Sequence, residues 1–245
     1  MKHLRPIFRF LFFVAFTAAI VAEIWLKNRF FGVDMRRSMR IRRRWARKLL
    51  AGIGVVVEEF GDIPVYPCII ISNHRSYLDP ILMLRQLDAY PVAKAELASW
   101  PIIGKGAKHA GILYLKRENV KSRAGTLQGI NAIIEDGFQV IIFPEGTTSA
   151  LSGTLPFKRG VFQLAAKLQY PIVPVALVFA SEEDFWVGKE NFLQHAGRRF
   201  REKKIKVALH YGPKIQGEAA EALLESTQTW INTQLDSQSA PGRAL

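Results

Sequence analysis

The sequence has 245 residues, and 49% of them are hydrophobic, which excludes a disordered protein and allows one sizeable core. A formal net charge of +13 and a pI near 10.0 predict an anionic partner: a phospholipid surface, a nucleic acid or an acidic substrate. The single cysteine, Cys68, excludes an intramolecular disulfide. We find no metal-ligand spacing, Walker loop or dinucleotide fingerprint, so we expect no metal and no bound cofactor.

An apolar helix is the first predicted element, from Phe10 to Ala22, with Thr17 as its one polar residue. Thirteen helical residues cover about 20 Å, less than the roughly 30 Å hydrocarbon core of a bilayer. The same pattern fits a signal peptide cleaved after Ala22. Positive charge on both flanks instead favours a monotopic helix in the inner leaflet of a bacterial inner membrane, with a single tilted span as the alternative.

A cluster of basic residues follows this helix, and no acidic residue occurs between Asp34 and Glu58. Such positive charge resists translocation and stays on the cytoplasmic side. Trp45, Leu49 and Leu50 are interleaved with the cluster, so we interpret it as a collar on anionic lipid rather than as a nucleic-acid patch. Its members are Arg36, Arg37, Arg40, Arg42, Arg43, Arg44, Arg47 and Lys48.

Beyond residue 50, short apolar runs rich in β-branched residues alternate with helical patterns. This alternation predicts an α/β fold with a central, largely parallel sheet flanked by helices. We expect strands at residues 55–57, 68–71, 92–94, 111–117, 140–143, 172–179 and 205–209, and helices at residues 80–87, 122–136, 160–168 and 218–235.

A polar stretch follows the strand that ends at Ile71. It places His74 at the tip of the strand, Ser76 at the expected N-cap of the next helix, and Asp79 in the first turn. Two interpretations are open. Ser76 and Asp79 can form an ordinary capping box. Alternatively, the Asp79 carboxylate accepts a proton from one nitrogen of His74 and leaves the other nitrogen as a base.

The order of the motifs carries a family resemblance. Asn73, His74 and Asp79 stand in the spacing NHxxxxD, and residues 143–147 read FPEGT. These blocks resemble the glycerolipid acyltransferase superfamily, whose best-known members are 1-acyl-glycerol-3-phosphate acyltransferases. The resemblance covers about residues 68–177, nearly half the chain. Its other blocks are matched by Lys94, Glu96, Leu97, Pro101, Gly104, Gly111, Arg117, Phe157, Lys158, Gly160 and the run from Pro171 to Val175.

The resemblance implies transfer of an acyl group from a thioester, acyl-coenzyme A or acyl-carrier protein, to the hydroxyl of a lysolipid. His74 would be the general base, and Asp79 would fix its tautomer and stabilise the imidazolium. The hydroxyl is supplied by the substrate, so we expect no acyl-enzyme. Backbone N–H groups around Gly146 and Thr147 would stabilise the oxyanion. Glu145 would accept a hydroxyl of the acceptor lipid, and Asn73 counts among the substrate-binding residues.

The resemblance leaves two acceptor headgroups open. Arg117 would bind a phosphate through its guanidinium fork, with Lys158 assisting. Many phosphatidate-forming relatives have arginine where this chain has Thr148, and relatives with threonine include enzymes that complete ornithine lipids. We therefore expect 1-acyl-sn-glycerol-3-phosphate as the acceptor, giving phosphatidic acid, with lyso-ornithine lipid as the alternative.

We divide the chain into an anchoring helix and polybasic segment at residues 1–50, an acyltransferase domain at residues 51–235, and a mobile tail at residues 236–245. The expected partners are the acyl donor, the lysophospholipid acceptor and an anionic membrane surface, without nucleic acid. A hypothesis of another class is a non-catalytic membrane-binding protein. It does not explain the presence of Asn73, His74, Asp79 and Glu145, because a scaffold does not need this set of residues.

Overall fold

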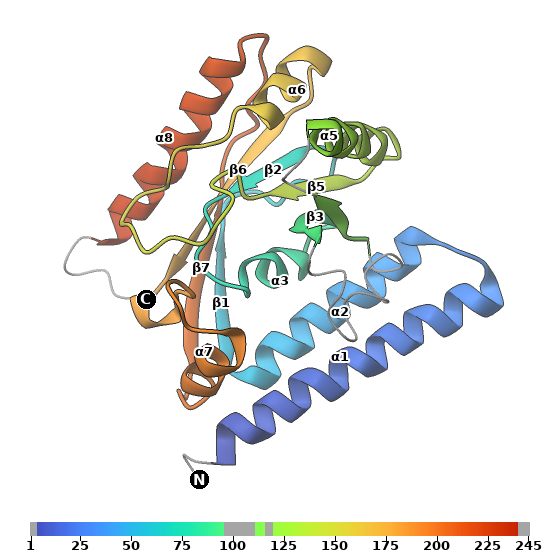
Figure 1. Cartoon of the computed structure of the whole chain (residues 1–245), viewed down its shortest axis with the longest axis vertical. Coiled ribbons are helices and arrows are strands. Elements are labelled where there is room, and N and C mark those ends of the chain that lie inside the picture. The colour runs from blue at the N-terminus through green and yellow to red at the C-terminus, as the bar shows by residue number, and fades with distance from the viewer. Residues whose placement is uncertain (1–3, 96–110, 116–119, 240–245) are drawn as a thin grey trace.

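A computed structural model describes residues 4–95, 111–115 and 120–239 of the chain. The described residues form a seven-stranded sheet with helices on both faces, and two long helices run side by side along one flank (Figure 1). In sheet order, the strands are β1 (Val55–Phe60), β7 (Ile205–Tyr211), β6 (Ile172–Phe179), β2 (Ile69–Ser72), β5 (Gln139–Ile142), β3 (Ala89–Lys94) and β4 (Leu113–Leu115).

Parallel pairing dominates the sheet. The pair β6–β7 is antiparallel, and the other five pairs of neighbouring strands are parallel, which confirms the predicted α/β class. In the middle of the sheet, Ile69 of β2 pairs with Ile172 of β6 on one side and with Val140 of β5 on the other. The carboxyl ends of β2, β5 and β6 therefore meet at one edge, where open α/β sheets place their sites.

Alternate side chains of the strands build two cores. Ile70 faces one core, whereas Ile69 and Ile71 face the other. Because β2 is buried on both faces, its sequence is an unbroken apolar run rather than an alternating one. The first core is covered by α2 (Met35–Ile53), α3 (Asp79–Leu84) and α7 (Phe192–Arg199), and the second by α5 (Val120–Glu135), α6 (Gly160–Leu168) and α8 (Ala220–Ser239).

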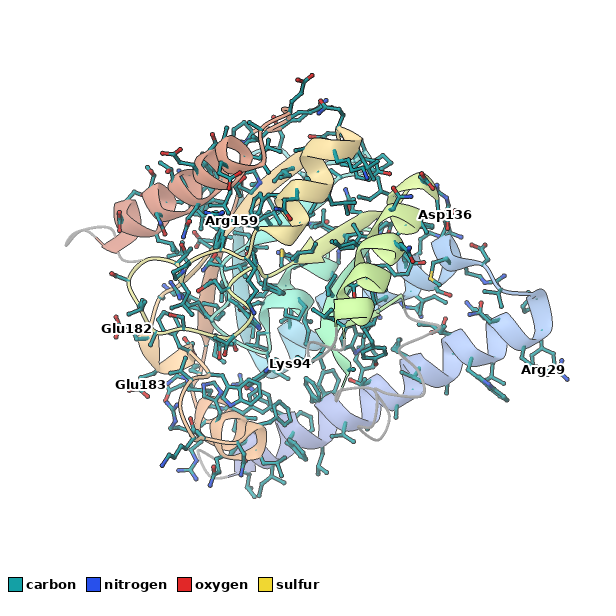
Figure 2. The ribbon with its side chains drawn as sticks, turned by 45° about the horizontal axis from the view of Figure 1, so that its top comes forward. Arg29, Lys94, Asp136, Arg159, Glu182 and Glu183 are labelled. Carbon is teal, nitrogen blue, oxygen red and sulfur yellow. The ribbon has the colours of Figure 1, made fainter. Side chains whose placement is uncertain are left out.

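Two of the helices that cover the second core, α6 and α8, are also linked at the surface. Arg159 lies immediately before α6, and Figure 2 shows it close to α8. Its guanidinium pairs with Glu221 of α8 at 3.2 Å. Both side chains are exposed, so this pair adds little to stability.

Helix α1 (Leu4–Phe31) departs from the usual pattern of a surface helix, because its buried side carries the polar residues Arg9, Thr17 and Asn28 beside Ile20 and Ile24. Each has a partner elsewhere in the chain: Trp45 Nε1 donates to Thr17 Oγ1, and Asn28 Nδ2 donates to Ser38 Oγ. The outward side carries large apolar residues, which is typical of a helix in contact with lipid. They are Leu4, Ile7, Phe8, Leu11, Trp25, Leu26, Phe30 and Phe31.

Arg9 fastens α1 to the body of the protein. Its guanidinium donates to the carbonyl oxygens of Phe200, Glu202 and Lys203, just beyond α7, at 3.2, 2.6 and 3.1 Å. These partners explain why the helix extends past the predicted 10–22 segment. With 28 residues it spans about 42 Å, and among the described helices it alone is long and apolar enough to cross a membrane.

The polybasic segment forms helix α2, which starts at the N-cap Asp34 and ends at Gly54 in the left-handed conformation, with φ 85°. Its apolar side, including Leu49, Leu50 and Ile53, belongs to the first core. The expected boundary at residue 50 therefore falls inside this helix. One cation of the cluster is structural: Arg42 is buried and donates to the carbonyl oxygens of Ala89 and Gly111.

Several predicted bounds shift by a few residues. Helix α3 begins at Asp79, after a turn at residues 77–78, and ends at Leu84. Helix α8 continues to Ser239 through the start of the expected tail, and residues 240–245 lie outside the described residues. Within the expected strand at 111–117, the structure describes β4 as three residues.

Candidate active site

The candidate site lies at the edge where β2, β5 and β6 end, and it is built from two loops. The β2–α3 loop (residues 73–78) carries His74, and the β5–α6 loop (residues 143–159) carries the FPEGT block. The loops are joined by the bond from Ser149 N–H to His74 O, at 3.0 Å. The neighbouring strand β3 pairs with β5 and ends at Lys94, which is labelled in Figure 2.

His74 and Asp79 form a close pair. His74 Nδ1 lies 2.7 Å from Asp79 Oδ2. The Asp79 side chain is 0% exposed and that of His74 is 23% exposed. A carboxylate only accepts hydrogen bonds, so Nδ1 carries the proton and Nε2 is the acceptor. The pair therefore offers a base at the open side of the site.

The same carboxylate oxygen also organises the loop. Asp79 Oδ2 accepts from the backbone N–H groups of Arg75 and Ser76, at 2.6 and 2.8 Å. Ser76 Oγ in turn accepts from Leu78 N–H at 3.3 Å. The N-cap of α3 is Leu78, which makes no side-chain capping bond, so the capping box expected at Ser76 does not form, because the helix begins only at Asp79. Asp79 Oδ2 instead stabilises the β2–α3 loop and orients His74 through the same oxygen.

The FPEGT block supports the histidine from the other side. The Phe143 ring stacks on the His74 imidazole, with centroids 4.2 Å apart and planes at 21°. Glu145 is 5% exposed, and its two oxygens accept from His74 N–H at 2.8 Å and from Leu155 N–H at 2.9 Å. Burial raises the pKa of Glu145, and the two backbone donors lower it. This carboxylate holds both loops in place rather than facing an open cavity.

Asn73 has a similar supporting place. It is fully buried, and its side-chain amide both donates to Leu177 O at 2.9 Å and accepts from Leu177 N–H at 2.8 Å. This two-point pairing extends the contact between β2 and β6 beyond the last backbone rung at Ser72 and Val175. Asn73 thus sets where the chain leaves the sheet and turns toward His74.

The remaining predicted site residues differ in their hydrogen-bond partners and exposure, and some lie outside the described residues. Gly146 N–H donates to Phe143 O at 3.1 Å, whereas Thr147 is exposed and donates its N–H to none of the described residues. Thr148 Oγ1 donates to Trp186 O at 2.6 Å, so its hydroxyl is used within the protein. Lys158 is exposed. Arg117 lies outside the described residues, as do Glu96, Leu97, Pro101 and Gly104 of the same block.

Comparison with known proteins identifies the family of this chain. The family model described as Acyltransferase matches residues 54–178, about half the chain, and includes both loops. The chain belongs to the acyltransferase family. Its resemblance to the glycerolipid acyltransferases is thereby confirmed.

Three similar proteins show how far the family likeness extends. A chloroplastic 1-acyl-sn-glycerol-3-phosphate acyltransferase of Brassica napus is 31% identical over 166 residues, which are 67% of this chain and 45% of that protein. A lyso-ornithine lipid O-acyltransferase of Pseudomonas aeruginosa is 27% identical and covers 95% of this chain and 93% of its own length. The crystal structure of the 1-acyl-sn-glycerophosphate acyltransferase PlsC from Thermotoga maritima superimposes with a TM-score of 0.75 at 19% identity, covering 99% of this chain and 100% of that one.

These matches differ in extent. The chain spans about half the length of the first curated relatives it matches, whereas it matches the Pseudomonas protein over nearly its whole length. The structural likeness includes the two N-terminal helices, because it covers almost every residue. At 19% identity it shows that this acyltransferase-family member shares the fold.

Sequence reasoning missed a half-buried aromatic cluster behind the β2–α3 loop of this family member. The Tyr77 ring contacts the rings of Trp186, Phe192 and His195 edge-on. Phe192 also contacts Phe13 of α1, with centroids 6.0 Å apart. The N-terminal helix thus reaches the candidate site through α7. These partners lie more than 100 positions from Tyr77 in the chain, and no local spacing indicates them.

Removing the Glu145 carboxylate should destabilise this acyltransferase-family member. Glu145→Ala leaves the buried N–H groups of His74 and Leu155 without acceptors, which should cost about 2–4 kcal/mol of unfolding free energy. Chemical denaturation in detergent measures it. Glu225→Ala, at an exposed position of α8, should change the unfolding free energy by less than about 0.5 kcal/mol. Equal effects of the two substitutions would contradict the supporting role of Glu145.

Stability should rise with pH because of His195. Its ring nitrogens lie 3.3 Å from Tyr77 Oη and 3.1 Å from Phe185 O, and burial lowers its pKa below the ordinary 6.5. Just below pH 6.5 the unfolded chain therefore binds a proton that the folded chain does not, so stability increases as the pH approaches 6.5 from below. We expect the melting temperature to rise between about pH 5 and about pH 7.

A histidine variant tests this assignment. His195→Gln should reduce the rise, and His210→Gln should remove a further part, because burial also lowers the pKa of His210. A variant without His195 that retains the full wild-type rise would contradict the assignment.

Proposed function

We propose that this protein is a membrane-associated O-acyltransferase that moves a fatty acyl group from a thioester donor to the free hydroxyl of a lysolipid. The observation that carries the proposal is the His74–Asp79 pair at 2.7 Å in a chain of the acyltransferase family. Acyl-coenzyme A and acyl-carrier protein both present such a thioester. The donor type remains part of the proposal.

The mechanism follows from the tautomer of His74. Nε2 takes the proton of the acceptor hydroxyl as its oxygen attacks the thioester carbonyl carbon, and Asp79 stabilises the imidazolium. The tetrahedral intermediate collapses, the C–S bond breaks, and the imidazolium returns the proton to the leaving thiolate. Thr147 N–H, which donates to no other group in the described part of the chain, is the candidate donor to the oxyanion. Glu145 and Asn73 act as positioning residues.

The proposed acceptor is 1-acyl-sn-glycerol-3-phosphate, which would give phosphatidic acid. Several relatives of 30–35% identity carry that activity in their names. Arg117 and Lys158 are the proposed phosphate ligands, since a guanidinium fork suits a phosphomonoester. Lyso-ornithine lipid is the second candidate. It is favoured by the nearly full-length match to the Pseudomonas protein and by Thr148, which puts no cation at that position.

Membrane association is supported by the two N-terminal helices. Helix α1 turns large apolar side chains outward, and α2 carries the basic collar beside it. Four arginines and a lysine of α2 line a surface hollow of about 410 Å³, which suits anionic headgroups: Arg40, Arg43, Arg44, Arg47 and Lys48. We place the protein at the cytoplasmic face of a bacterial inner membrane, with residues 1–50 as its anchor.

A paired acceptor assay tests the proposed function. Purified protein in detergent receives acyl-coenzyme A or acyl-carrier protein with either lysophosphatidate or lyso-ornithine lipid, and mass spectrometry identifies the product. Turnover of lysophosphatidate supports the first acceptor, and turnover of the aminolipid alone supports the second. Folded protein that turns over neither acceptor with either donor would contradict the proposal.

A further inference from the structure

Arg75, the residue next to His74, is one of the largest fully buried side chains of the protein, and its role goes beyond the motif that surrounds it. Only 2% of it is exposed. Its guanidinium donates to Ser149 O at 3.0 Å and to Gly153 O at 2.8 Å, both in the β5–α6 loop. A charged side chain is almost never buried without such compensation.

Arg75 has further contacts through the face of its guanidinium and through its backbone. Its guanidinium carbon lies 5.4 Å from the centroid of the Phe185 ring. Its backbone N–H donates to Asp79 Oδ2 at 2.6 Å, and its carbonyl oxygen accepts from Trp186 N–H at 2.8 Å. Arg75 therefore ties together three segments that are distant in sequence: the β2–α3 loop, the β5–α6 loop and the segment that follows β6.

Arg75 also enters the charge balance of the two carboxylates that accept hydrogen bonds from His74. Burial lowers the pKa of Arg75, and the nearby charges of Glu145 and Asp79 oppose that lowering. Asp184 is another buried carboxylate, but its charge is already paired with that of Arg199 in α7, at 2.7 Å. With neutral His74, the two buried carboxylates and Arg75 sum to −1, and without Arg75 they sum to −2.

We propose that Arg75 is a positioning residue of this site, whose guanidinium holds the β5–α6 loop against His74 and whose charge keeps the imidazole neutral and able to act as a base. A base must be unprotonated at the working pH. Two carboxylates with no cation beside them would instead favour the imidazolium. The inference rests on the proposed function, because it concerns the same histidine.

The decisive variant is Arg75→Met, which removes the charge and both carbonyl contacts. We expect the acidic limb of its kcat/KM profile to move to higher pH by about one unit, a size typical of one nearby charge. Activity should therefore fall about tenfold at pH values below the limb and recover partly at higher pH. A purely structural role predicts an equal loss at every pH, and that result would overturn the proposal.

Arg75→Lys separates charge from shape. A single ammonium group cannot span both carbonyl oxygens and cover the Phe185 ring, but it keeps the positive charge. We expect lower activity at every pH, with the acidic limb at the wild-type position. A limb that moves as far as in Arg75→Met would overturn the assigned role of the charge.

The matched control is Arg42→Met. Arg42 is also a buried arginine that donates to two backbone carbonyls, but the charges acting on it are those of Asp88, Tyr90 and Arg43. Its loss should lower the melting temperature and leave the acidic limb unmoved. If Arg75→Met fails to fold, Arg75→Gln takes its place, because its side-chain amide carries no charge and can still donate to one of the two carbonyl oxygens. Its limb should also move to higher pH, and a limb at the wild-type pH would overturn the proposal.

A second readout needs no substrate. In full-length protein labelled with ¹⁵N-histidine, the His74 imidazole signals, assigned by their absence in His74→Ala, should reach half-protonation at higher pH in Arg75→Met than in the wild type. Identical titrations would overturn the inference about Arg75. Wild-type protein that acylates no lysolipid would contradict the proposed function alone, so the two failures are distinguishable.

Discussion

His74→Ala should lower the rate of lysolipid acylation by about 10²–10⁴-fold, the range that a positioned general base contributes. The substitution removes Nε2, the acceptor of the hydroxyl proton, while the backbone N–H of residue 74 still donates to Glu145. The fold should therefore persist. Initial rates of product formation, measured by mass spectrometry with saturating donor, give the effect directly.

A histidine outside the site is the matched control. His210 of β7 stacks on Phe60 of the edge strand β1, and His210→Ala should keep the acylation rate close to that of the wild type. Binding of His74→Ala to anionic vesicles should equal that of the wild type, because α1 and α2 are unchanged. A His74→Ala protein that still acylates within a few-fold of the wild-type rate would exclude general-base catalysis by this residue.

Asp79→Asn should have the second largest effect, a fall in rate of about 10²–10³-fold with the protein still folded. The asparagine oxygen can take the place of Oδ2 and accept from the backbone N–H groups of Arg75 and Ser76. What the variant loses is the negative charge that stabilises the imidazolium. Steady-state rates together with circular dichroism spectra measure the two consequences separately.

Asp79→Ala separates the two roles of this carboxylate. It removes the acceptor of two buried N–H groups as well as the charge, so it should also lower the unfolding free energy by about 2–4 kcal/mol. Equal stability of the alanine and asparagine variants would show that the carboxylate does not organise the loop. An asparagine variant with the wild-type rate would show that its charge is not needed by His74.

Most of the sheet was predictable because its signals are local. The strand at 172–179 and the helix at 160–168 have the predicted bounds, since an unbroken apolar run and helical spacing each mark a buried element. The antiparallel pairing of β6 with β7 has no such local signal. Whether a strand runs parallel or antiparallel to its neighbour depends on how the connecting segment brings the chain back to the sheet, and that is a property of the whole fold.

The N-terminal segment shows where local reasoning stops. Its apolar residues predict a helix of thirteen, because Arg9 and Glu23 read as its ends. The helix is longer, since Arg9 finds three carbonyl oxygens beyond α7, and Glu23 pairs with Lys27 and Arg44. A polar residue ends an apolar segment only when no partner satisfies it, and most of these partners lie outside α1, in the segment beyond α7 and in α2.

Local signals in the sequence were enough for the α/β class and the family motifs, and they offered the pairing of His74 with Asp79 as one of two interpretations, because only five positions separate a strand end from a helix start. The roles of Asn73, Glu145 and Arg75 depend on the tertiary structure, because each has a partner far away in the chain, at separations of 104, 71 and 74 positions. A buried amide, carboxylate or guanidinium is assigned by the group that satisfies it. Those groups reach the site only when β2, β5 and β6 are brought together at one edge of the sheet.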